Sequence, residues 1–433
     1  MRLPLSQNPT WRYAIFGAMN LSQGLLCGLV FTSYFFLLTD LKLTPVQVGA
    51  AVAWARLPWA LKLLWGPILD RYVGGVQGRR RPFILAGQFL LGAFVLALAV
   101  VPKDAEWLGV IATLVFLASA SATLQNVALN GLCVDLVAQN QLGRTNAVIW
   151  ATKSVGVAIG GGALYAATAY LPWSVLLTAL ALAIWALTIV PLMVRERAPE
   201  EVSEHGLRRL ELAELRRTFA IPRVWIALLA AFLIPLGYGL LSTPYQFLLR
   251  DHLHWSKETI GFLTGVLDPL TGIVGAFTGG FLTDRFGARR ILVFASIGMA
   301  VTMAALALCP DAWSSQGAMF TWYGVHFIVQ YLFGAGMLAF FMSLSNPAIG
   351  ATHIGIYFSL NNLCYTFCDW GGGSLLTRLS AELNGSTVPT TDGYVYTFAI
   401  CAVIQVVVLV PLIWCDPQRI RASFLALPKG GPA

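Results

Sequence analysis

The chain has 433 residues, of which 57% are hydrophobic and 11% are charged, and its formal net charge is +8. A soluble domain carries roughly 25% charged residues, so this composition argues against a soluble enzyme, and the continuous apolar runs exclude the alternating pattern of a transmembrane β-barrel. Long apolar stretches recur from end to end and predict a helical protein that crosses the membrane many times.

Twelve apolar segments each approach the ~20 residues that a helix needs to cross a bilayer. They cover residues 12–38, 45–69, 82–101, 108–134, 143–168 and 172–194, and then 224–249, 258–283, 290–309, 316–344, 352–378 and 394–415. The predicted fold class is therefore an all-α membrane protein. Its predicted regions are a six-helix bundle over 1–194, a cytoplasmic linker over 195–223, a second six-helix bundle over 224–415 and a cytoplasmic tail over 416–433.

The positive charges orient these spans. If the N-terminus lies inside, twenty Lys and Arg residues fall in inner loops and tails, whereas five fall in outer loops: Lys42, Lys103, Arg250, Lys257 and Arg378. Because basic residues concentrate on the cytoplasmic side, both termini are predicted to be cytoplasmic, and the membrane explains the net charge better than nucleic acid does. The linker ends in LRRLELAELRRTF at 207–219, which predicts an amphipathic helix on the inner face.

One signature occurs in both halves, at the inner end of a span. It reads GPILDR at 66–71, followed by GRRR at 78–81, and it returns as GFLTDRFGARR at 280–290. Its two aspartates, Asp70 and Asp284, are 214 positions apart, about half of the chain. A signature repeated at that period indicates two similar halves.

The repeated signature has the chemistry of a gate. Its first glycine would let a neighbouring helix approach closely, and its aspartate could pair with the following arginine or cap a neighbouring helix. A contact that forms in one conformation and breaks in another acts as a latch. The predicted gating residues are Gly66, Asp70, Arg71, Arg79, Arg80, Gly280, Asp284, Arg285 and Arg289. The alternative is that the basic loops only signal topology.

The first copy of the signature resembles one branch of the major facilitator superfamily. KLLWGPILDRY at 62–72, with the arginine loop at 78–81, is similar to the AmpG-type muropeptide permeases and the related acetyl-CoA transporters. The resemblance implies twelve transmembrane helices in two pseudo-symmetric six-helix bundles that move a solute by alternating access. It also implies proton-linked uptake of a polar or anionic solute, such as a muropeptide or a CoA thioester, across a bacterial cytoplasmic (inner) membrane.

The fourth span departs from that branch. Relatives commonly read Ser-Ala-x-Gln-Asp there, with a second Asp four residues later, whereas this chain reads SATLQNVALN at 121–130. Asn126 and Asn130 thus stand where the resemblance places acids. An amide can hydrogen-bond a substrate but cannot take up a proton at ordinary pH, so proton coupling has either moved to other residues or been lost.

Three ionisable side chains are expected deep in the membrane, where charges are costly and usually functional. Arg56 and Asp268 lie ~21 Å and ~24 Å along their helices from the aspartates of the repeated signature. They could therefore pair across the pathway when it closes on the outside. Lys153 lies ~16 Å from the inner end of its span and could hold a carboxylate or a phosphate. The alternatives are a static ion pair and a lysine that reaches back to water.

Polar side chains at central depth are the remaining candidates, because amides and tyrosines suit a polyhydroxylated or amide-rich solute. With Arg56 and Lys153, the predicted substrate-binding residues are Asn20, Gln23, Gln125, Asn126, Asn130, Tyr238, Tyr245, Gln246, Gln330, Asn361, Asn362 and Tyr365. The candidates for proton coupling are Asp268, His326 and Asp369. Each polar residue could equally bond a neighbouring helix.

The sequence contains no HExxH, P-loop or nucleophile-elbow motif in a context that would suit catalysis. The chain is therefore predicted not to be an enzyme and to need neither a cofactor nor a metal. Its expected partners are a small-molecule substrate, the lipid bilayer and protons, with no nucleic acid, and it is expected to be a monomer. The alternative cargo is a siderophore or another small metabolite, and the alternative class is a non-transporting sensor or assembly factor.

Overall fold

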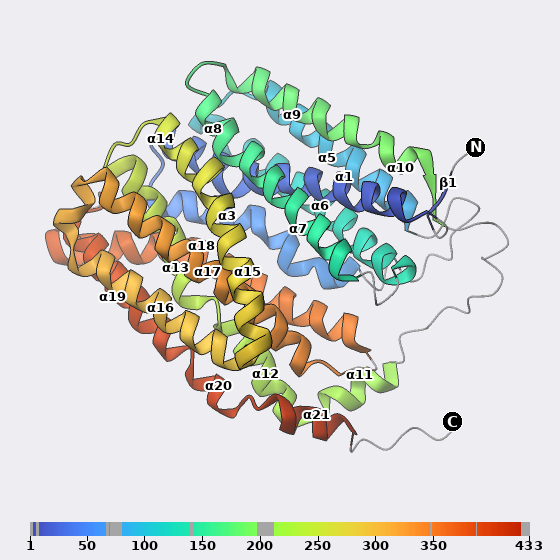
Figure 1. Cartoon of the computed structure of the whole chain (residues 1–433). Coiled ribbons are helices and arrows are strands. Elements are labelled where there is room, and N and C mark those ends of the chain that lie inside the picture. Colours follow the sequence, from blue (N-terminus) through green and yellow to red (C-terminus); the bar gives the residue numbers. More distant parts are fainter. Residues whose placement is uncertain are drawn as a thin grey trace. The chain divides into compact units, whose positions relative to one another are not determined.

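The computed structural model describes residues 3–5, 8–65, 69, 80–137, 142–196, 212–346, 349–386 and 388–425. Almost all of these residues are helical (Figure 1). The chain divides into two compact units. The first unit comprises residues 1–207 and 249–269, and the second comprises residues 208–248 and 270–433.

The first unit takes most of its helices from the first half of the sequence. These are α1 (Pro9–Gly28), η1 (Leu29–Ser33), α2 (Tyr34–Asp40), α3 (Pro45–Ala60), η2 (Leu61–Leu64), α5 (Arg81–Val100), η3 (Ala105–Trp107), α6 (Leu108–Leu136), α7 (Leu142–Ala158), η5 (Ile159–Ala163), α8 (Leu164–Ala167), α9 (Trp173–Leu187) and α10 (Ile189–Met193). The second half adds most of η7 (Leu248–His252), α14 (Lys257–Phe262) and η8 (Leu263–Leu267). Within this unit α1 packs on α7, and α5 packs on α6 and α9.

The second unit contains the helices of the linker and of the remaining second half. These are α11 (Leu212–Phe219), α12 (Pro222–Leu233), α13 (Leu236–Phe247), α15 (Asp268–Phe286) from residue 270 onward, α16 (Ala288–Leu308), η9 (Pro310–Ser314), α17 (Gln316–Leu344), α18 (Gly350–Asn384), α19 (Thr391–Val407), α20 (Val410–Trp414) and α21 (Pro417–Leu425). Here α13 packs on α18 and α19, and α16 packs on α17 and α19. The helix expected in the linker is present as α11.

Within the described ranges, ten helical stretches are long and apolar enough to cross a membrane. The other two predicted spans, 45–69 and 352–378, correspond to α3 with η2 and to α18. Both carry ionisable or amide side chains within their apolar sequence, which lowers their mean hydropathy. The all-helical membrane fold is thus confirmed, whereas the region boundaries at 194, 223 and 415 and the cytoplasmic termini stay predictions.

Close packing of α1 on α7 and η5 depends on glycine. A Cβ added at Gly24 would lie 2.2 Å from the backbone oxygen of Lys153, and one at Gly160 would lie 2.0 Å from that of Leu25. These distances are far below van der Waals contact, so only glycine lets the helix backbones meet here. This contact brings the C-terminal part of α7, which carries Lys153, and the following η5 against the C-terminal part of α1.

Glu196 fixes the start of α5. It follows β2 (Val194–Arg195), which pairs in parallel with β1 (Leu3–Pro4). Its carboxylate accepts hydrogen bonds from the backbone N–H of Arg80, at 2.5 Å, and from that of Arg81. The first N–H groups of a helix have no partner inside the helix, so this carboxylate caps α5 and complements its dipole.

Candidate functional site

Basic side chains of the first unit lie beside aromatic rings. The guanidinium carbon of Arg56 (α3) lies 4.0 Å from the ring centre of Phe31 (η1). The ammonium of Lys153 (α7) lies 5.6 Å from the ring of Trp150 and 5.9 Å from that of Trp59. Cation–π contacts of this kind orient a cation without neutralising its charge.

These basic side chains also act electrostatically on one another or on a common neighbour. Lys153 interacts electrostatically with Lys62 on η2. Lys153 and Arg56 both interact electrostatically with the thiol of Cys27 on α1. Four segments therefore converge on one positively charged region, which we name the cationic cluster (Arg56, Lys62 and Lys153). Because like charges repel one another, an anion would stabilise this region. The sequence pointed to Arg56 and Lys153 separately, and in the structure the charges of both act on the thiol of Cys27.

A row of amides, Gln23, Asn126 and Asn130, joins α1 to α6. Asn126 Nδ2 donates to Gln23 Oε1 at 2.8 Å, and Asn130 Nδ2 donates to Asn126 Oδ1 at 3.2 Å. Gln23 is buried, Asn126 is half-buried and Asn130 is exposed, so the row leads from the helix interface to the helix surface. Gln23 Nε2 has no hydrogen-bond partner in the described part of the chain, which leaves a buried donor that a bound group can satisfy.

Two other predicted residues of the first unit are engaged in helix packing. Gln125 Nε2 donates to Gln88 Oε1 at 2.7 Å, and Gln88 Nε2 donates to the backbone oxygen of Ile184 at 2.7 Å. Asn20 Nδ2 donates to the backbone oxygen of Phe16, one turn earlier on α1, at 2.8 Å. Such bonds between and within buried helices stabilise the bundle, and a role of Asn20 and Gln125 in substrate binding stays a prediction.

In the second unit the predicted tyrosines belong to aromatic groups. The hydroxyls of Tyr238 (α13) and Tyr365 (α18) are hydrogen-bonded to each other. The ring of Tyr238 meets Phe333 (α17) edge-on, with centroids 5.4 Å apart. Tyr245, near the end of α13, packs on Trp322 (α17) with centroids 4.9 Å apart. Aromatic rings with a hydroxyl group suit sugar or peptide groups of a ligand. The same contacts also pack α13 against α17 and α18, so a role of these tyrosines in binding stays a prediction.

The remaining amides of the second unit, Gln246, Gln330, Asn361 and Asn362, lie on α13, α17 and α18. Asn362 Nδ2 donates to a backbone oxygen one turn earlier on its own helix at 2.8 Å, and Gln246 Nε2 donates to a serine hydroxyl one turn earlier at 3.4 Å. Asn361 Nδ2 lies 3.5 Å from the sulfur of Met337 on α17. Their role in binding stays a prediction.

The three candidates for proton coupling have different surroundings. His326 (α17) is buried; its Nδ1 lies 2.7 Å from the hydroxyl oxygen of Thr302 on α16, and its ring stacks on Trp322 at 4.8 Å. Asp369 (α18) is also buried. Asp268 is half-buried at the start of α15, directly after the π-helical turn η8. A role of Asp268, His326 or Asp369 in proton coupling stays a prediction.

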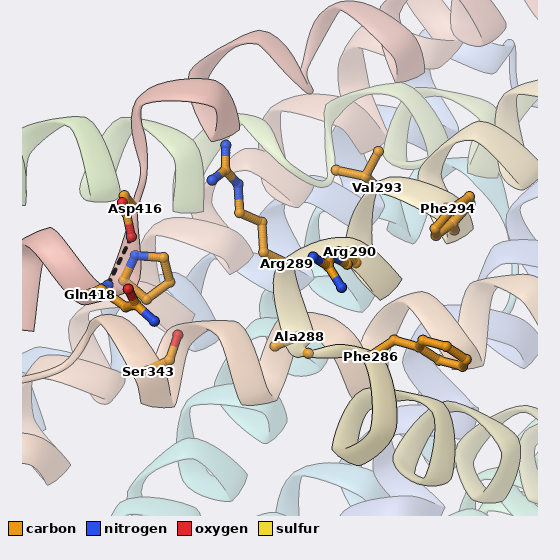
Figure 2. Close-up of a pocket in the computed structure, with 11 residues that line it drawn as sticks. Phe286, Ala288, Arg289, Arg290, Val293, Phe294, Ser343, Asp416 and Gln418 are labelled. Carbon is orange, nitrogen blue, oxygen red and sulfur yellow. Dashed lines mark hydrogen bonds between the residues drawn. The ribbon is translucent and has the colours of Figure 1, made fainter.

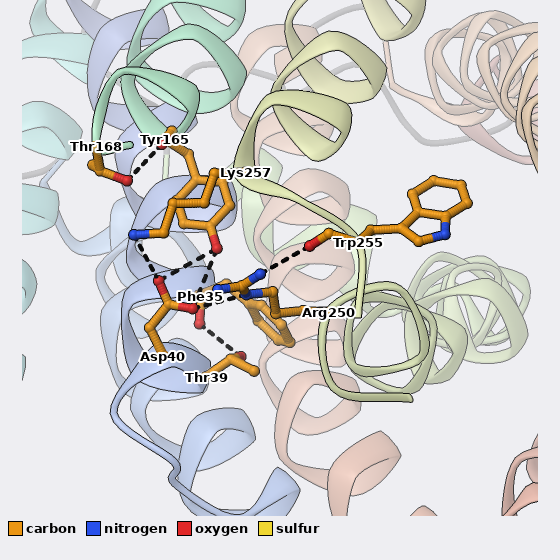
Figure 3. A network of polar contacts seen from close by, with 8 residues as sticks. All are labelled: Phe35, Thr39, Asp40, Tyr165, Thr168, Arg250, Trp255 and Lys257. Carbon is orange, nitrogen blue, oxygen red and sulfur yellow. Dashed lines mark hydrogen bonds and ion pairs between the residues drawn. The ribbon is translucent and has the colours of Figure 1, made fainter. Parts of the chain in front are cut away.

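Asp40, which the sequence did not single out, lies at the centre of a charged cluster in the first unit (Figure 3). Its carboxylate accepts from Arg250 Nε at 2.8 Å and pairs with Lys257 Nζ at 3.3 Å. The hydroxyl of Tyr165 lies 3.3 and 3.4 Å from its two oxygens. Arg250 Nη1 donates in addition to the backbone oxygen of Trp255 at 2.8 Å. We name Asp40, Tyr165, Arg250 and Lys257 the outer cluster, after the side to which these span ends are predicted to face.

The outer cluster joins the two halves of the sequence. Asp40 and Tyr165 come from the first half, and Arg250 and Lys257 come from the second, yet all four belong to the first unit. The side chains are 19% exposed for Asp40 and 26% exposed for Arg250 and Lys257. Ion pairs in such a half-buried setting are stronger than those on an open surface. The signal in the sequence was an acid and two bases in loops predicted to lie on the same side.

Helical irregularities accompany this cluster. The described residues include four π-helical turns, η1, η5, η7 and η8, which lie wholly or almost wholly in the first unit. Ser33, at the end of η1, donates to the backbone oxygens of Gly160 and Gly161 at 2.9 and 2.8 Å. A Cβ at Gly162 would lie 2.2 Å from the backbone nitrogen of Gly265 on η8. Widened turns are frequent at functional sites and where helices bend.

The predicted gate is described only in part. Gly66, Asp70, Arg71 and Arg79 lie outside the described residues. Arg80 is buried, and its guanidinium lies against α6, where a Cβ added at Gly131 would be 2.7 Å from Arg80 Nε. The gating role of the first copy therefore stays a prediction.

In the second copy of the signature, Asp284 and Arg285 are exposed near the end of α15. The guanidinium carbon of Arg285 lies 5.5 Å from the ring centre of Phe286. Arg289, in the first turn of α16, is half-buried and lines a pocket of the second unit. These positions at the ends of two apolar helices fit both a gate and a topology signal, so gating stays a prediction here as well.

The close helix approach that we expected at Gly280 is wrong. A Cβ added there meets no atom within 4 Å among the described residues. The contact is made by the other glycines of α15: a Cβ would lie 2.5 Å from the backbone oxygen of Ile328 at Gly275, and 2.9 Å from the Cα of Leu332 at Gly279. Gly280 lies one residue, and hence about 100°, further around the helix than Gly279, and it faces away from α17.

Comparison with known proteins covers nearly the whole chain. The profile of the Major Facilitator Superfamily matches residues 16–368 and 227–424. The chain is 25% identical over 386 residues to the anhydromuropeptide permease of Escherichia coli (strain K12), an alignment that covers 85% of this chain and 73% of that protein. It is also 25% identical over 400 residues to an uncharacterized protein of Haemophilus influenzae, covering 88% of this chain and 89% of that one.

Among solved structures, the D-xylose-proton symporter has the same fold. It superposes with a TM-score of 0.69 over 92% of this chain and 96% of that chain, at 13% sequence identity. At this identity the likeness concerns the fold alone.

Proposed function

The chain belongs to the major facilitator superfamily, and from this membership we propose that it imports an anionic, amide-rich solute, with a muropeptide as the preferred cargo. It is a multi-pass membrane transporter of small solutes and not an enzyme, as the sequence predicted. The predicted resemblance to the AmpG-type branch is confirmed by the relative named anhydromuropeptide permease. Proton linkage, a bacterial inner membrane and cytoplasmic termini are further parts of the proposal.

The cationic cluster is the observation that supports this cargo. A muropeptide combines peptide carboxylates with a sugar and several amide groups. Guanidinium and ammonium groups bind carboxylates through charge-assisted hydrogen bonds. Arg56 and Lys153 lie beside aromatic rings in an apolar bundle, and charged side chains at such positions are usually functional.

The amide row supports the same cargo, because it lies next to the cationic cluster. Gln23 is four residues from Cys27, whose thiol is near both Arg56 and Lys153. Residues four apart lie on one face of a helix, so α1 carries the buried amide and the cationic region on the same side. A ligand with a carboxylate and neighbouring amides can engage both groups at once.

The outer cluster supports transport by alternating access. We propose that its ion pairs keep the outward end of the first unit closed while the solute site opens inward, and that they separate when the outward end opens. Half-buried pairs suit this purpose, because their strength is sufficient to favour one state without making it permanent. The π-helical turns next to the cluster provide places where the spans can bend.

Binding tests the cargo directly. The purified protein in detergent is heated with an anhydromuropeptide, with acetyl-CoA or with a ferric siderophore. We expect a saturable rise in melting temperature with the muropeptide, since a ligand of the folded state stabilises it by mass action. The rise should vanish in the Arg56→Gln/Lys153→Gln variant and persist in Lys42→Gln, which removes an exposed cation. A rise with another ligand alone would reassign the cargo, and an equal rise in all variants would remove the role of the cationic cluster.

Proton linkage is tested separately with Asp268→Asn, His326→Gln and Asp369→Asn. In proteoliposomes, the coupling residue is the one whose substitution abolishes accumulation driven by a pH gradient while exchange of solute across the membrane continues. If wild-type accumulation does not respond to a pH gradient, the proton-linked part of the proposal is wrong.

A further inference from the structure

A pocket of about 500 Å³ opens on the second unit where α15 is followed by α16 (Figure 2). Its lining combines Arg289 and Arg290 with the aromatic rings of Phe286 and Phe294. We propose that this pocket binds the headgroup of an anionic phospholipid, with an acyl chain lying along the neighbouring aromatic surface. The site is separate from the solute site and does not depend on which solute the protein carries.

The pocket lies where two apolar spans meet the membrane boundary. Helix α15 ends at Phe286 and α16 begins at Ala288, and both belong to stretches that are apolar enough to cross a membrane. Only Gly287 separates them, with a φ of +88° that favours glycine. A one-residue connection between two spans places the pocket at the level where phospholipid headgroups lie.

The polar side of the pocket fits a phosphate. Arg289 and Arg290 occupy the first turn of α16, a helix that begins without a side-chain cap, and Figure 2 shows Asp416 and Gln418 on the facing segment. Asp416 carries one negative charge against the two arginines, so the lining has an excess of positive charge; its carboxylate also lies 3.4 Å from Arg419 and accepts from the backbone N–H of Gln418 at 2.9 Å. Arginine forms two parallel hydrogen bonds with a phosphate, and basic pockets at the ends of spans suit anionic headgroups.

The apolar side of the pocket favours a lipid over a soluble phosphate. The side chains of Phe286 and Phe294 are 46% and 70% exposed, and Phe281 on α15 and Val301 on α16 are exposed as well. In the hydrocarbon region such exposed apolar side chains meet acyl chains. A phosphate that carries acyl chains can contact both the arginines and the exposed rings of Phe286 and Phe294, whereas a soluble phosphate contacts only the arginines.

A lipid titration tests the proposal on the whole purified protein. Delipidated protein in detergent receives dioleoyl-phosphatidylglycerol, dioleoyl-phosphatidylcholine, sn-glycerol 3-phosphate or inorganic phosphate, and the melting temperature is followed. We expect a saturable rise with phosphatidylglycerol and none with the other three. In Arg289→Gln/Arg290→Gln the apparent Kd for phosphatidylglycerol should increase about 25-fold, since each arginine near an anionic headgroup contributes roughly fivefold.

Two further variants make the outcome specific. Arg285→Gln removes an exposed charge one residue before Phe286, the first residue of the pocket lining, and should leave the Kd unchanged. Ser343→Trp fills the pocket but keeps both arginines, and it should also weaken phosphatidylglycerol binding, which keeps the test valid if the double variant does not fold. An unchanged Kd in the double variant, an equal loss in Arg285→Gln, or an equal rise with phosphatidylcholine or inorganic phosphate would each overturn the proposal.

Discussion

Replacing Asp40 by asparagine tests whether the outer cluster holds the first unit together. The amide keeps the shape of the carboxylate but removes the charge that faces Arg250 at 2.8 Å and Lys257 at 3.3 Å. An exposed ion pair contributes ~0.5 kcal/mol, and breaking a buried one costs roughly 3–5 kcal/mol. Because these side chains are half-buried, we expect Asp40→Asn to lower the free energy of unfolding by about 2 kcal/mol.

A double-mutant cycle separates this interaction from other effects of the substitution. The free energy of unfolding is measured by titrating detergent-solubilised protein with dodecyl sulfate, for wild type, Asp40→Asn, Arg250→Gln and the double variant. We expect a coupling energy of about 1–2 kcal/mol between the two sites. Asp104→Asn, an exposed acid predicted to lie on the same side, should change stability by less than about 0.5 kcal/mol.

The reasoning is refuted by a coupling energy below about 0.5 kcal/mol. It is equally refuted if Asp104→Asn destabilises the protein as much as Asp40→Asn does, because the effect would then be one of net charge and not of the contacts in the outer cluster.

Three further predictions concern packing, capping and access. Gly160→Ala should lower the free energy of unfolding by about 2 kcal/mol or more, because its Cβ would meet a backbone oxygen at 2.0 Å. Gly280→Ala, whose Cβ would have no atom of the described residues within 4 Å, should be neutral or stabilising by roughly 0.5 kcal/mol; equal effects would contradict the packing described. Glu196→Ala should cost about 1–2 kcal/mol through loss of the α5 cap, and Glu382→Ala, an exposed acid, should cost nothing measurable. A membrane-permeant maleimide should label the exposed Cys309 faster than the four buried cysteines, as read by mass spectrometry after brief exposure; faster labelling of any buried thiol would be inconsistent with the described packing.

Most of the spans could be predicted from the sequence, because crossing a bilayer requires a local run of apolar residues. The same local property accounts for the two weaker segments, α3 with η2 and α18, whose polar side chains interrupt the run. The prediction at Gly280 failed for a physical reason. A repeated motif identifies a residue type, but not the face of the helix that meets a neighbour, and Gly279 makes that contact instead.

The composition of the site was harder to predict, because it depends on long-range contacts. Arg56 and Lys153 were identified by the cost of placing a charge in an apolar helix, but their approach to a common thiol depends on how α1, α3 and α7 pack. Asp40 and Arg250 are 210 positions apart, and no periodicity links them. Charge in a loop usually indicates topology alone, and only the folded chain shows that these charges meet.

Uptake into proteoliposomes tests the central claim most directly. Vesicles preloaded with unlabelled anhydromuropeptide are diluted into labelled anhydromuropeptide, and the label inside is measured for wild type, Lys42→Gln and Arg56→Gln/Lys153→Gln. We predict entry of label with wild type and Lys42→Gln, and entry at least about tenfold slower with the double variant, since each lost charge-assisted hydrogen bond costs roughly 1.5–3 kcal/mol. No entry with wild type, or equal entry with all three proteins, would contradict the account.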